Sequence, residues 1–130
     1  MNIFNKYLCF PLLILILGCS SYTETDRIIY ISEKDGNPEI YSMEKNGSDP
    51  QRLTNSSRSE SNPKLSPDGK YLSFLVNKNS IEELYIVEME ENGKQVQVSE
   101  KGLNIEDFFW SPNSQKITYK AKDILSLIHI

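Results

Sequence analysis

Hydrophobic residues follow two different patterns along this chain of 130 residues. One continuous apolar run occupies positions 7–17. Beyond it, short apolar segments are separated by Gly, Pro, Asn and Asp, which is typical of strands joined by tight turns. No stretch between the turns has the period of a helix. The most complete part of the pattern predicts four strands, at 63–66, 71–76, 83–89 and 95–98.

Two of these predicted strands lack the alternation of a half-exposed sheet. Segments 71–76 and 84–87 are apolar at nearly every position, so both of their faces should be covered. Since no helix is available to cover them, the sheets must cover one another. The last strand of each unit, at 51–54 and 95–99, is shorter and more polar, as an outer edge strand should be. The pattern therefore predicts an all-β chain in which four-stranded antiparallel sheets stack face to face, the arrangement of a β-propeller.

The chain also repeats itself with a period near 44 residues. The segment starting at Ser66 recurs at Ser111, an offset of 45 (111 − 66), and Ile40-Tyr41 recurs as Leu84-Tyr85, an offset of 44 (84 − 40). A fixed period of this length is typical of propeller blades. It predicts about two and a half blades, with three strands in 28–54, four in 63–99 and two in 106–120. Neighbouring sheets should pack through Ile29, Ile31, Leu72, Phe74, Leu84, Ile86 and Trp110.

One turn of the repeat has a clear physical basis. In Ser66-Pro67-Asp68-Gly69, Pro fixes φ, Asp can bond its own backbone, and Gly can take the left-handed conformation. The second copy has Ser114 in place of Gly, so either Asn113 takes the positive φ or the turn bears a strain of about 1–2 kcal/mol. We interpret both turns as structural and not as binding sites. Their residues are Ser66, Pro67, Asp68 and Gly69 in the first copy, and Ser111, Pro112 and Asn113 in the second.

The start of the chain has the features of an export signal. Residues 1–18 carry one positive charge, Lys6, ahead of an apolar run that is shorter than the roughly 20 residues needed to cross a bilayer. The run ends in Ile16-Leu17-Gly18-Cys19, which resembles the bacterial lipobox. That resemblance implies cleavage before Cys19 and a lipid on its sulfur. A plain secretory signal followed by an incidental cysteine is the alternative.

The number and position of the cysteines favour a lipidated Cys19 over a plain secretory signal. Cys9 would be removed with the signal peptide, which leaves Cys19 without a partner for a disulfide in an oxidising compartment. Acylation removes the free thiol and holds the chain at a membrane, with residues 19–27 as a polar tether. We therefore expect an exported protein, anchored through the lipid to the cell membrane or the outer membrane. It would face the periplasm or the cell exterior.

Composition excludes several classes of function. Hydrophobic residues at 38% and charged residues at 25% fit a folded globular segment. A formal net charge of −4, without basic clusters, speaks against nucleic acid as a partner. One His and two Cys leave little for a metal site or a His-based triad, so we expect no cofactor and no metal.

No catalytic motif is found either. The chain has no Gly-x-Ser-x-Gly sequence and no glycine-rich phosphate loop, and His129 is a weak candidate for a ligand or base. The acidic residues around Glu82, Glu83 and Glu88 are interpreted as a solvated face. The aromatic run 108–110 is interpreted as core packing in preference to a platform for sugars. We therefore expect a protein that is not an enzyme.

The repeat also carries a family resemblance. Segments 35–54 and 62–74, with their Asp-Gly, Ile-Tyr-Ser, Arg-Leu-Thr and Ser-Pro-Asp-Gly elements, resemble the TolB-type propeller repeat. The resemblance assigns residues 28–130 to propeller blades and implies a non-enzymatic scaffold that binds a protein or cell-envelope partner. Two alternatives remain: the propeller part of a serine peptidase similar to prolyl oligopeptidase, and a glycan-binding or glycan-cleaving propeller. The family has an α/β domain before the propeller, where this chain has only a short tether.

The chain is short for a closed propeller. Propellers have four to eight blades, whereas this chain has room for about two and a half, so we expect a truncated fragment of a longer protein. Residues 124–130 depart from the repeat, and Ser126 to Ile130 resemble translated sequencing-adapter sequence. We expect this segment to be artefactual; the alternative is a natural strand. Without its missing blades, the stretch 20–130 is expected to self-associate or to fold only loosely.

Overall fold

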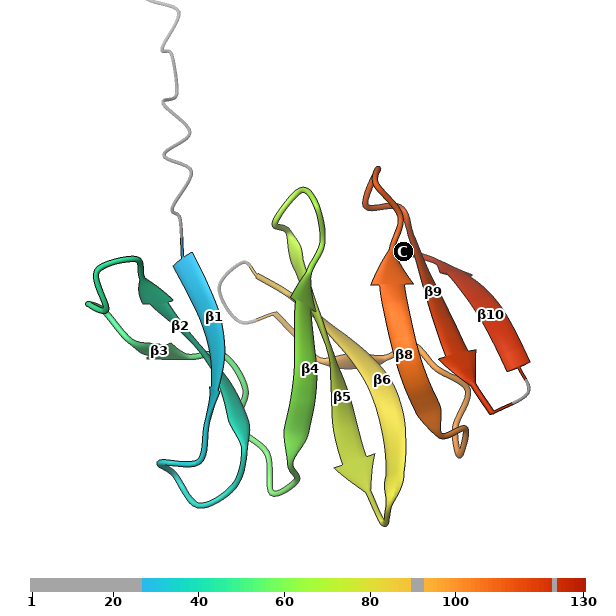
Figure 1. Ribbon diagram of the computed structural model, residues 1–130, viewed down its shortest axis with the longest axis horizontal. Helices are drawn as coiled ribbons and strands as arrows, with labels where there is room; N and C mark the ends of the chain where they lie inside the picture. The colour runs from blue at the N-terminus through green and yellow to red at the C-terminus, as the bar shows by residue number, and fades with distance from the viewer. Residues whose placement is uncertain (1–26, 90–92, 123) are drawn as a thin grey trace, which may run out of the picture.

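The computed structural model describes residues 27–89, 93–122 and 124–130 (Figure 1). The predicted signal helix at 1–18, Cys19 and all of the tether but Arg27 lie outside the described residues. The described part of the chain forms ten strands. They are β1 (Arg27–Ser32), β2 (Glu39–Glu44), β3 (Gln51–Arg52), β4 (Glu60–Leu65), β5 (Tyr71–Lys78), β6 (Ile81–Glu88), β7 (Val96–Gln97), β8 (Ile105–Trp110), β9 (Lys116–Ala121) and β10 (Ile124–His129). Among these residues, no helix is of a length and apolar character that would span a bilayer.

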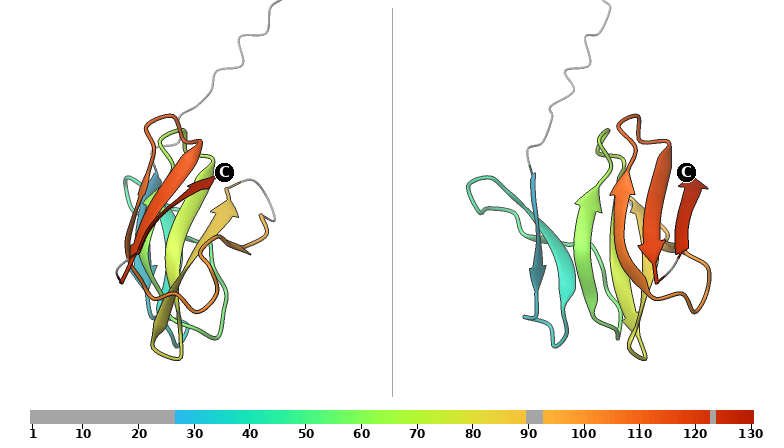
Figure 2. Two further views of the ribbon diagram at one scale, coloured as in Figure 1. Left: turned by 90° about the vertical axis from the view of Figure 1, so that its right-hand side faces the viewer. Right: turned by 45° about the vertical axis from the view of Figure 1, so that its right-hand side comes forward.

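The strands form three antiparallel sheets, which confirms the predicted all-β partial propeller. The first sheet has the order β1-β2-β3, the second β4-β5-β6-β7, and the third β8-β9-β10. Figures 1 and 2 show the three sheets standing one behind another along the long axis. Strand order equals sequence order in each sheet, as the repeat predicted. The third sheet contains one strand more than was predicted for 106–120, because Ile124–His129 pairs along β9, with Leu127 opposite Thr118.

The middle sheet is covered on both faces, which explains its unbroken apolar segments. All residues from Leu72 to Val76 on β5 are buried. Leu72, Phe74 and Val76 belong to the core shared with the first sheet, where Ile40 packs, whereas Leu75 belongs to the core shared with the third. Successive strand residues therefore face two different cores. Each large apolar side chain contributes about 1.5–3 kcal/mol by its burial.

Three residues that were predicted to pack between sheets or in the core, Ile31, Ile86 and Phe109, are not part of the buried cores. Ile31 is 43% exposed, because β1 is an edge strand with no inner neighbour among the described residues. Ile86 is only half-buried and belongs to neither core. Phe109 is 60% exposed, so the prediction of core packing is wrong for this ring. The alternation along β8 turns Phe108 inward, fully buried, and Phe109 outward.

A polar latch joins the second and third sheets beside their apolar core. The indole N–H of Trp110 donates to Ser73 Oγ at 2.8 Å, and that hydroxyl donates to the Lys64 carbonyl at 2.8 Å. Lys64 Nζ in turn donates to Asp107 Oδ1 at 2.8 Å and lies 4.4 Å from the centre of the Phe109 ring. Ser73 is fully buried but satisfied, which explains a polar residue in the middle of an apolar strand.

The two repeat turns share one backbone geometry. The Gly69 N–H donates to the Ser66 carbonyl at 2.8 Å, and the Ser114 N–H donates to the Ser111 carbonyl at 2.9 Å. Gly69 has a φ of 72° and Ser114 a φ of 59°, so Ser114 and not Asn113 takes the left-handed conformation. Its hydroxyl accepts a hydrogen bond from the Asp68 N–H at 3.0 Å. That bond, of about 1 kcal/mol, offsets part of the backbone strain.

The two ends of the strands differ in what they display. Figure 1 shows the start of β1, the turns after β4 and β8, and the end of the chain at the upper edge. The loop after β1, the start of β4 and the hairpin between β5 and β6 lie at the lower edge. The candidate site lies at this lower edge.

Candidate binding site between the first two sheets

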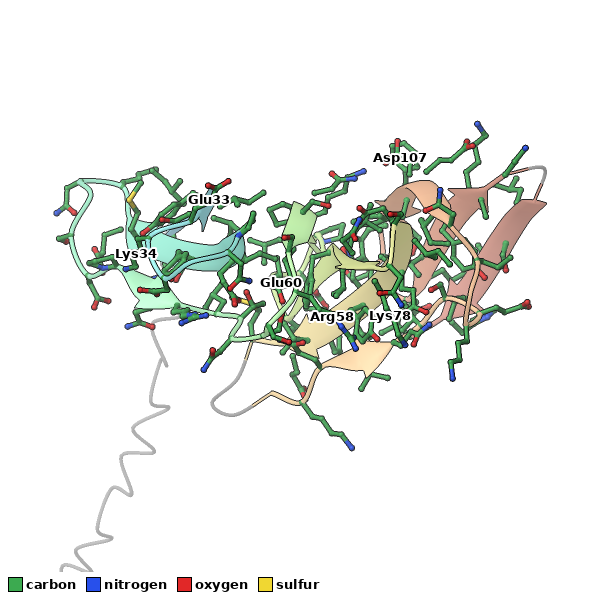
Figure 3. All side chains as sticks on the ribbon, turned by 90° about the horizontal axis from the view of Figure 1, so that it is seen from below. Glu33, Lys34, Arg58, Glu60, Lys78 and Asp107 are labelled. Atoms are coloured by element: carbon green, nitrogen blue, oxygen red, sulfur yellow. The ribbon has the colours of Figure 1, made fainter. Side chains whose placement is uncertain are left out.

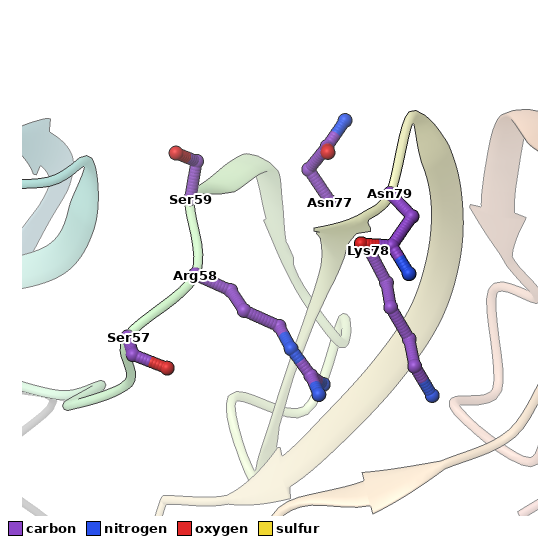
Figure 4. A pocket seen from close by; sticks show the side chains of 6 residues that line it. All are labelled: Ser57, Arg58, Ser59, Asn77, Lys78 and Asn79. Carbon is purple, nitrogen blue, oxygen red and sulfur yellow. The ribbon is translucent and has the colours of Figure 1, made fainter.

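A polar pocket opens at the lower edge of the second sheet, beside the loop that connects it to the first sheet. Its cavity of about 320 Å³ has one wall from the loop before β4 and another from the hairpin of β5 and β6 (Figure 4). The lining residues are Ser57, Arg58, Ser59, Asn77, Lys78 and Asn79. Sequence analysis did not single out any of them, because they come from two segments that carry no recognisable motif.

The local backbone fixes the two walls. The Asn77 N–H donates to the Ser59 carbonyl at 2.9 Å and so ties one wall to the other. Asn79 and Ser80, with φ values of 52° and 66°, form a two-residue hairpin that is closed by the pairing of Lys78 with Ile81. Two successive positive φ values match the right-handed twist of the flanking strands. The position of Lys78 is thus set by the strand and not by a long loop.

The pocket is positively charged. Figures 3 and 4 show the side chains of Arg58 and Lys78 close together, one from each wall. Arg58 is exposed and Lys78 half-buried, and no carboxylate is among the lining residues. Within the described residues, neither cation forms an ion pair. The pocket therefore carries two cations that have no ion-pair partner among the described residues, although the Arg58 side chain also interacts with the Tyr85 hydroxyl.

An ion pair between the buried Glu39 and the exposed Arg52 supports the wall that carries Arg58. Glu39, at the start of β2, is fully buried. Its Oε1 accepts hydrogen bonds from Arg52 Nη2 at 2.7 Å and from the Ser56 N–H at 2.9 Å. The Asn37 side chain donates to the same oxygen at 3.2 Å. Three donors thus converge on one carboxylate oxygen, which favours the charged form of Glu39.

A second buried carboxyl group lies beside it. Glu60, at the start of β4, is 1% exposed. Its Oε2 lies 2.6 Å from Thr54 Oγ1, and its Oε1 lies 2.7 Å from Ser56 Oγ. Since Thr54 Oγ1 already accepts from the Ile40 N–H at 2.8 Å, its proton is available for Glu60. Hydroxyl partners can donate or accept, so this environment suits either protonation state of Glu60.

The two carboxyl groups are held in different protonation states. Burial, assisted by the neighbouring Glu39, raises the pKa of Glu60 to about 7. Burial also acts to raise the pKa of Glu39, but hydrogen bonds to Glu60, Ser56, Thr54 and Arg52 outweigh it and lower that pKa to about 2. At mildly acidic pH the pair therefore shares one negative charge, which is paired with Arg52. This arrangement avoids the cost of two adjacent buried carboxylates.

The junction of the second and third sheets uses the same repeat positions differently. Glu83 occupies the repeat position that is equivalent to Glu39. Its side chain is only 2% exposed, so the interpretation of this residue as part of a solvated face is wrong. Its carboxylate accepts from the Gly102 N–H at 3.4 Å and the Tyr85 hydroxyl at 3.5 Å. The 44-residue offset from Glu39 was the sequence signal that could have shown the burial of both residues.

The residues that the sequence singled out lie away from this pocket. Cys19 is outside the described residues. The turn of Ser66, Pro67, Asp68 and Gly69, and the turn of Ser111, Pro112 and Asn113, are at the upper edge, opposite the pocket (Figure 1). Across the described ranges, no cluster of His, Cys, Asp and Glu side chains has the arrangement of a metal site.

Comparison with known proteins identifies the architecture. A family model described as the TolB beta propeller domain matches residues 19–128. The chain belongs to this family. The Tol-Pal system protein TolB of Desulfosudis oleivorans is 39% identical over 79 residues, which are 61% of this chain and 18% of that protein. A TolB homologue of Chlorobaculum tepidum is 31% identical over 124 residues, 92% of this chain and 28% of that protein.

Solved structures show the same fold. TolB from Acinetobacter baumannii superposes with a TM-score of 0.60 at 23% identity, covering 79% of this chain and 29% of that one. A protein assigned as TolB in Agrobacterium tumefaciens gives a TM-score of 0.65 at 18% identity, covering 80% of this chain and 42% of the other. The TolB-like chain thus spans less than half the length of each of these relatives.

Proposed function

We propose that this TolB-type propeller segment belongs to a membrane-anchored lipoprotein and serves as a non-enzymatic scaffold that binds a protein or cell-envelope partner. The observation that carries the proposal is the family match over 19–128, which begins at the cysteine of the lipobox-like sequence. One relative is named as a component of the Tol-Pal system, which supports a partner in the cell envelope. The repeat turns would then be structural elements of the blades.

The position of the pocket supports binding away from the anchor. The start of β1, which follows the tether, is at the upper edge, whereas the loop before β4 and the β5–β6 hairpin, which carry the pocket, are at the lower edge (Figure 1). A chain attached to a membrane through Cys19 could therefore present its cationic pocket to a partner on the far side of the blades.

The buried carboxyl groups support a scaffold and not an enzyme. Glu39 and Glu60 have divergent pKa values of the kind used in acid–base catalysis. However, they are 0% and 1% exposed, and they bond to Arg52, Thr54 and Ser56. A substrate has no access to them, because a general acid or base must come within hydrogen-bond distance of the reacting atom. Their role is to join the first two sheets.

The anchor is tested by replacing its cysteine. We expect Cys19→Ala to lose incorporation of labelled palmitate and to move from the membrane fraction to the soluble fraction of cells. The matched control is Cys9→Ala, which lies in the predicted signal peptide and should retain both properties. A Cys19→Ala variant that stays with the membrane would show that the lipid anchor is wrong.

The scaffold role is tested by site-specific photo-crosslinking in living cells. A photo-reactive residue in place of Asn79, at the pocket, should form an adduct with an envelope protein. The same residue in place of Lys70, at the opposite edge, should form little of that adduct. Equal adducts from both positions would argue against binding at the lower edge.

A further inference from the structure

We propose that the pocket formed by the loop before β4 and the β5–β6 hairpin binds a carboxylate of a protein partner, from an acidic side chain or a chain terminus. The proposal rests on the scaffold function proposed above, because it assumes that the partner is a protein. The residues that recognise the carboxylate are Arg58 and Lys78, with the hydroxyl groups of Ser57 and Ser59 at the rim.

An anionic ligand follows from the charges. Arg58 and Lys78 line one cavity from opposite walls, and among the described residues no carboxylate neutralises either of them. By contrast, Arg52, a few positions earlier, pairs with Glu39 at 2.7 Å and with Asp35 at 3.3 Å. The planar guanidinium of an arginine can hold both oxygens of a carboxylate, and a lysine adds a compact charge.

A monoanion suits the surroundings better than a phosphate dianion. The charged carboxylate of Glu39 lies behind the wall that carries Arg58, through its bond to the Ser56 N–H at 2.9 Å. The chain as a whole has a net charge of −4. Both charges oppose a second negative charge on the ligand. Asn79 adds amide donor and acceptor groups at the rim, which can pair with the backbone of a bound peptide.

The pocket is specific to the first junction. The repeat places Leu103 at the second junction where Arg58 stands at the first, an offset of 45 (103 − 58). Leu103 is half-buried and packs against the apolar core of that junction. The corresponding place between the second and third sheets is therefore filled by an aliphatic side chain. At this repeat position, an arginine thus lines the proposed binding pocket in one copy, and a leucine packs in the core in the next copy.

Lysine reactivity provides a direct test in the full-length chain held in detergent micelles. Lys78 is acetylated with a water-soluble reagent, and its rate of modification is followed by peptide mass spectrometry. One probe is a capped peptide with three consecutive acidic residues; a second has Gln and Asn in their place; a third is inorganic phosphate. Lys70, exposed at the opposite edge, is the internal control.

The acidic peptide should slow acetylation of Lys78 several-fold and leave Lys70 unaffected, while the neutral peptide should protect neither. Arg58→Gln should weaken this protection by about tenfold, the usual effect of one charge-assisted hydrogen bond. Lys70→Gln, with the same change in charge, should leave it intact. Absence of protection at Lys78, equal protection at both lysines, or protection by phosphate alone would overturn the proposal.

These results are separable from a failure of the scaffold function. If Lys78 is not protected while the Asn79 crosslink to an envelope protein persists, the carboxylate proposal is wrong and the scaffold remains. If Lys78 is protected by the acidic peptide while no crosslink forms in cells, the pocket chemistry holds and the protein partner is wrong.

Discussion

The two junctions between neighbouring sheets use the same repeat positions with different chemistry. At the first junction, Glu39 pairs with Arg52 at 2.7 Å and lies beside the buried carboxyl group of Glu60. At the second, Gln97 and Ile105 occupy the places of Arg52 and Glu60, and the partners of Glu83 within the described residues are Gly102 and Tyr85, at the long distances of 3.4 and 3.5 Å. Both junctions have an apolar core, but only the first adds a pair of buried carboxyl groups with an arginine partner. The ion pair at the second junction, Lys64 with Asp107, is only partly buried.

The backbone is nevertheless almost the same at both. The Leu53 N–H donates to the Ile40 carbonyl at 2.8 Å, and the equivalent Val98 N–H donates to the Leu84 carbonyl at 2.9 Å. A buried hydroxyl, Thr54 or Ser99, accepts a hydrogen bond from the backbone N–H of Ile40 on β2 or of Leu84 on β6, respectively. The repeat thus specifies how strands pair, and the loops between blades are free to vary. At these loops the first connection has Arg58 in a polar pocket, and the second has Leu103 against the apolar core.

The largest effect is expected from the apolar core of the second junction. Phe108→Ala should cost about 3–5 kcal/mol of local stability, since the ring is fully buried. Hydrogen exchange of the full-length chain in micelles should show lost protection in β6, β8 and β9. Phe109→Ala, at a 60% exposed ring, is the control and should cost less than about 1 kcal/mol. Similar losses in both variants would show that the inward and outward rings are wrongly assigned.

A smaller effect is expected from the ionic network of the first junction. Glu39→Gln leaves the Arg52 guanidinium without its main partner and should destabilise β2 and β4 by about 1–3 kcal/mol. Glu83→Gln is the matched change at the second junction and should cost less than about 1 kcal/mol, because Glu83 makes only long hydrogen bonds. Hydrogen exchange of the two variants measures both effects. The reverse order would contradict the difference between the junctions.

The smallest effects are expected in the two repeat turns. Gly69→Ala should destabilise the chain by about 1 kcal/mol, because an alanine is strained at a φ of 72°. Ser114→Gly should change stability by less than about 1 kcal/mol, since relief of strain is offset by loss of the bond to the Asp68 N–H. Hydrogen exchange of the amides in both turns measures these changes. A clear gain in Ser114→Gly would mean that this bond contributes nothing.

Much of the fold could be predicted because it depends on local pattern. The offset between Ile40 and Leu84 and the unbroken apolar segment of β5 gave the strand order and the stacking of sheets. The predictions that Ile31 and Phe109 are buried were wrong, because the exposure of these side chains depends on whether a neighbouring strand or sheet covers them. That information lies outside the segment that contains each residue.

The polar contacts could not be predicted in the same way. Glu39, Arg52 and Glu60 come from three different strands, and the burial of Glu39 and Glu60 depends on contacts with the loop before β4. Charged residues at strand ends are usually solvated, so Glu83 was misassigned. The pocket could not be predicted for the same reason, because Arg58 and Lys78 come close only when the loop before β4 and the β5–β6 hairpin lie side by side in the fold. Only the repeat offset between Glu39 and Glu83 could have indicated buried carboxylates.

The pH dependence of hydrogen exchange tests the difference between the junctions most directly. Because the pKa of Glu60 is raised from 4.5 to about 7, its protonated form stabilises the folded state fully below pH 4.5, and this stabilisation is lost as the pH rises through 7. The pKa of Glu39 is lowered to about 2, so its stabilisation is lost only as the pH falls from 4.5 through 2. Raising the pH from about 5 to 8 should therefore weaken the first junction alone, on the order of 1–3 kcal/mol.

The amides to follow are that of Glu60, which bonds to the Pro38 carbonyl across the first junction, and that of Asn77, which bonds to the Ser59 carbonyl next to Glu60. The reference is the amide of Val98, whose side chain packs against the core of the second junction. After correction for intrinsic exchange, the first two should lose protection between about pH 5 and 8, Val98 should not, and Glu60→Gln should remove the difference. An equal change at both junctions, or a gain of protection at the first, would contradict the buried carboxyl pair and the contrast that depends on it.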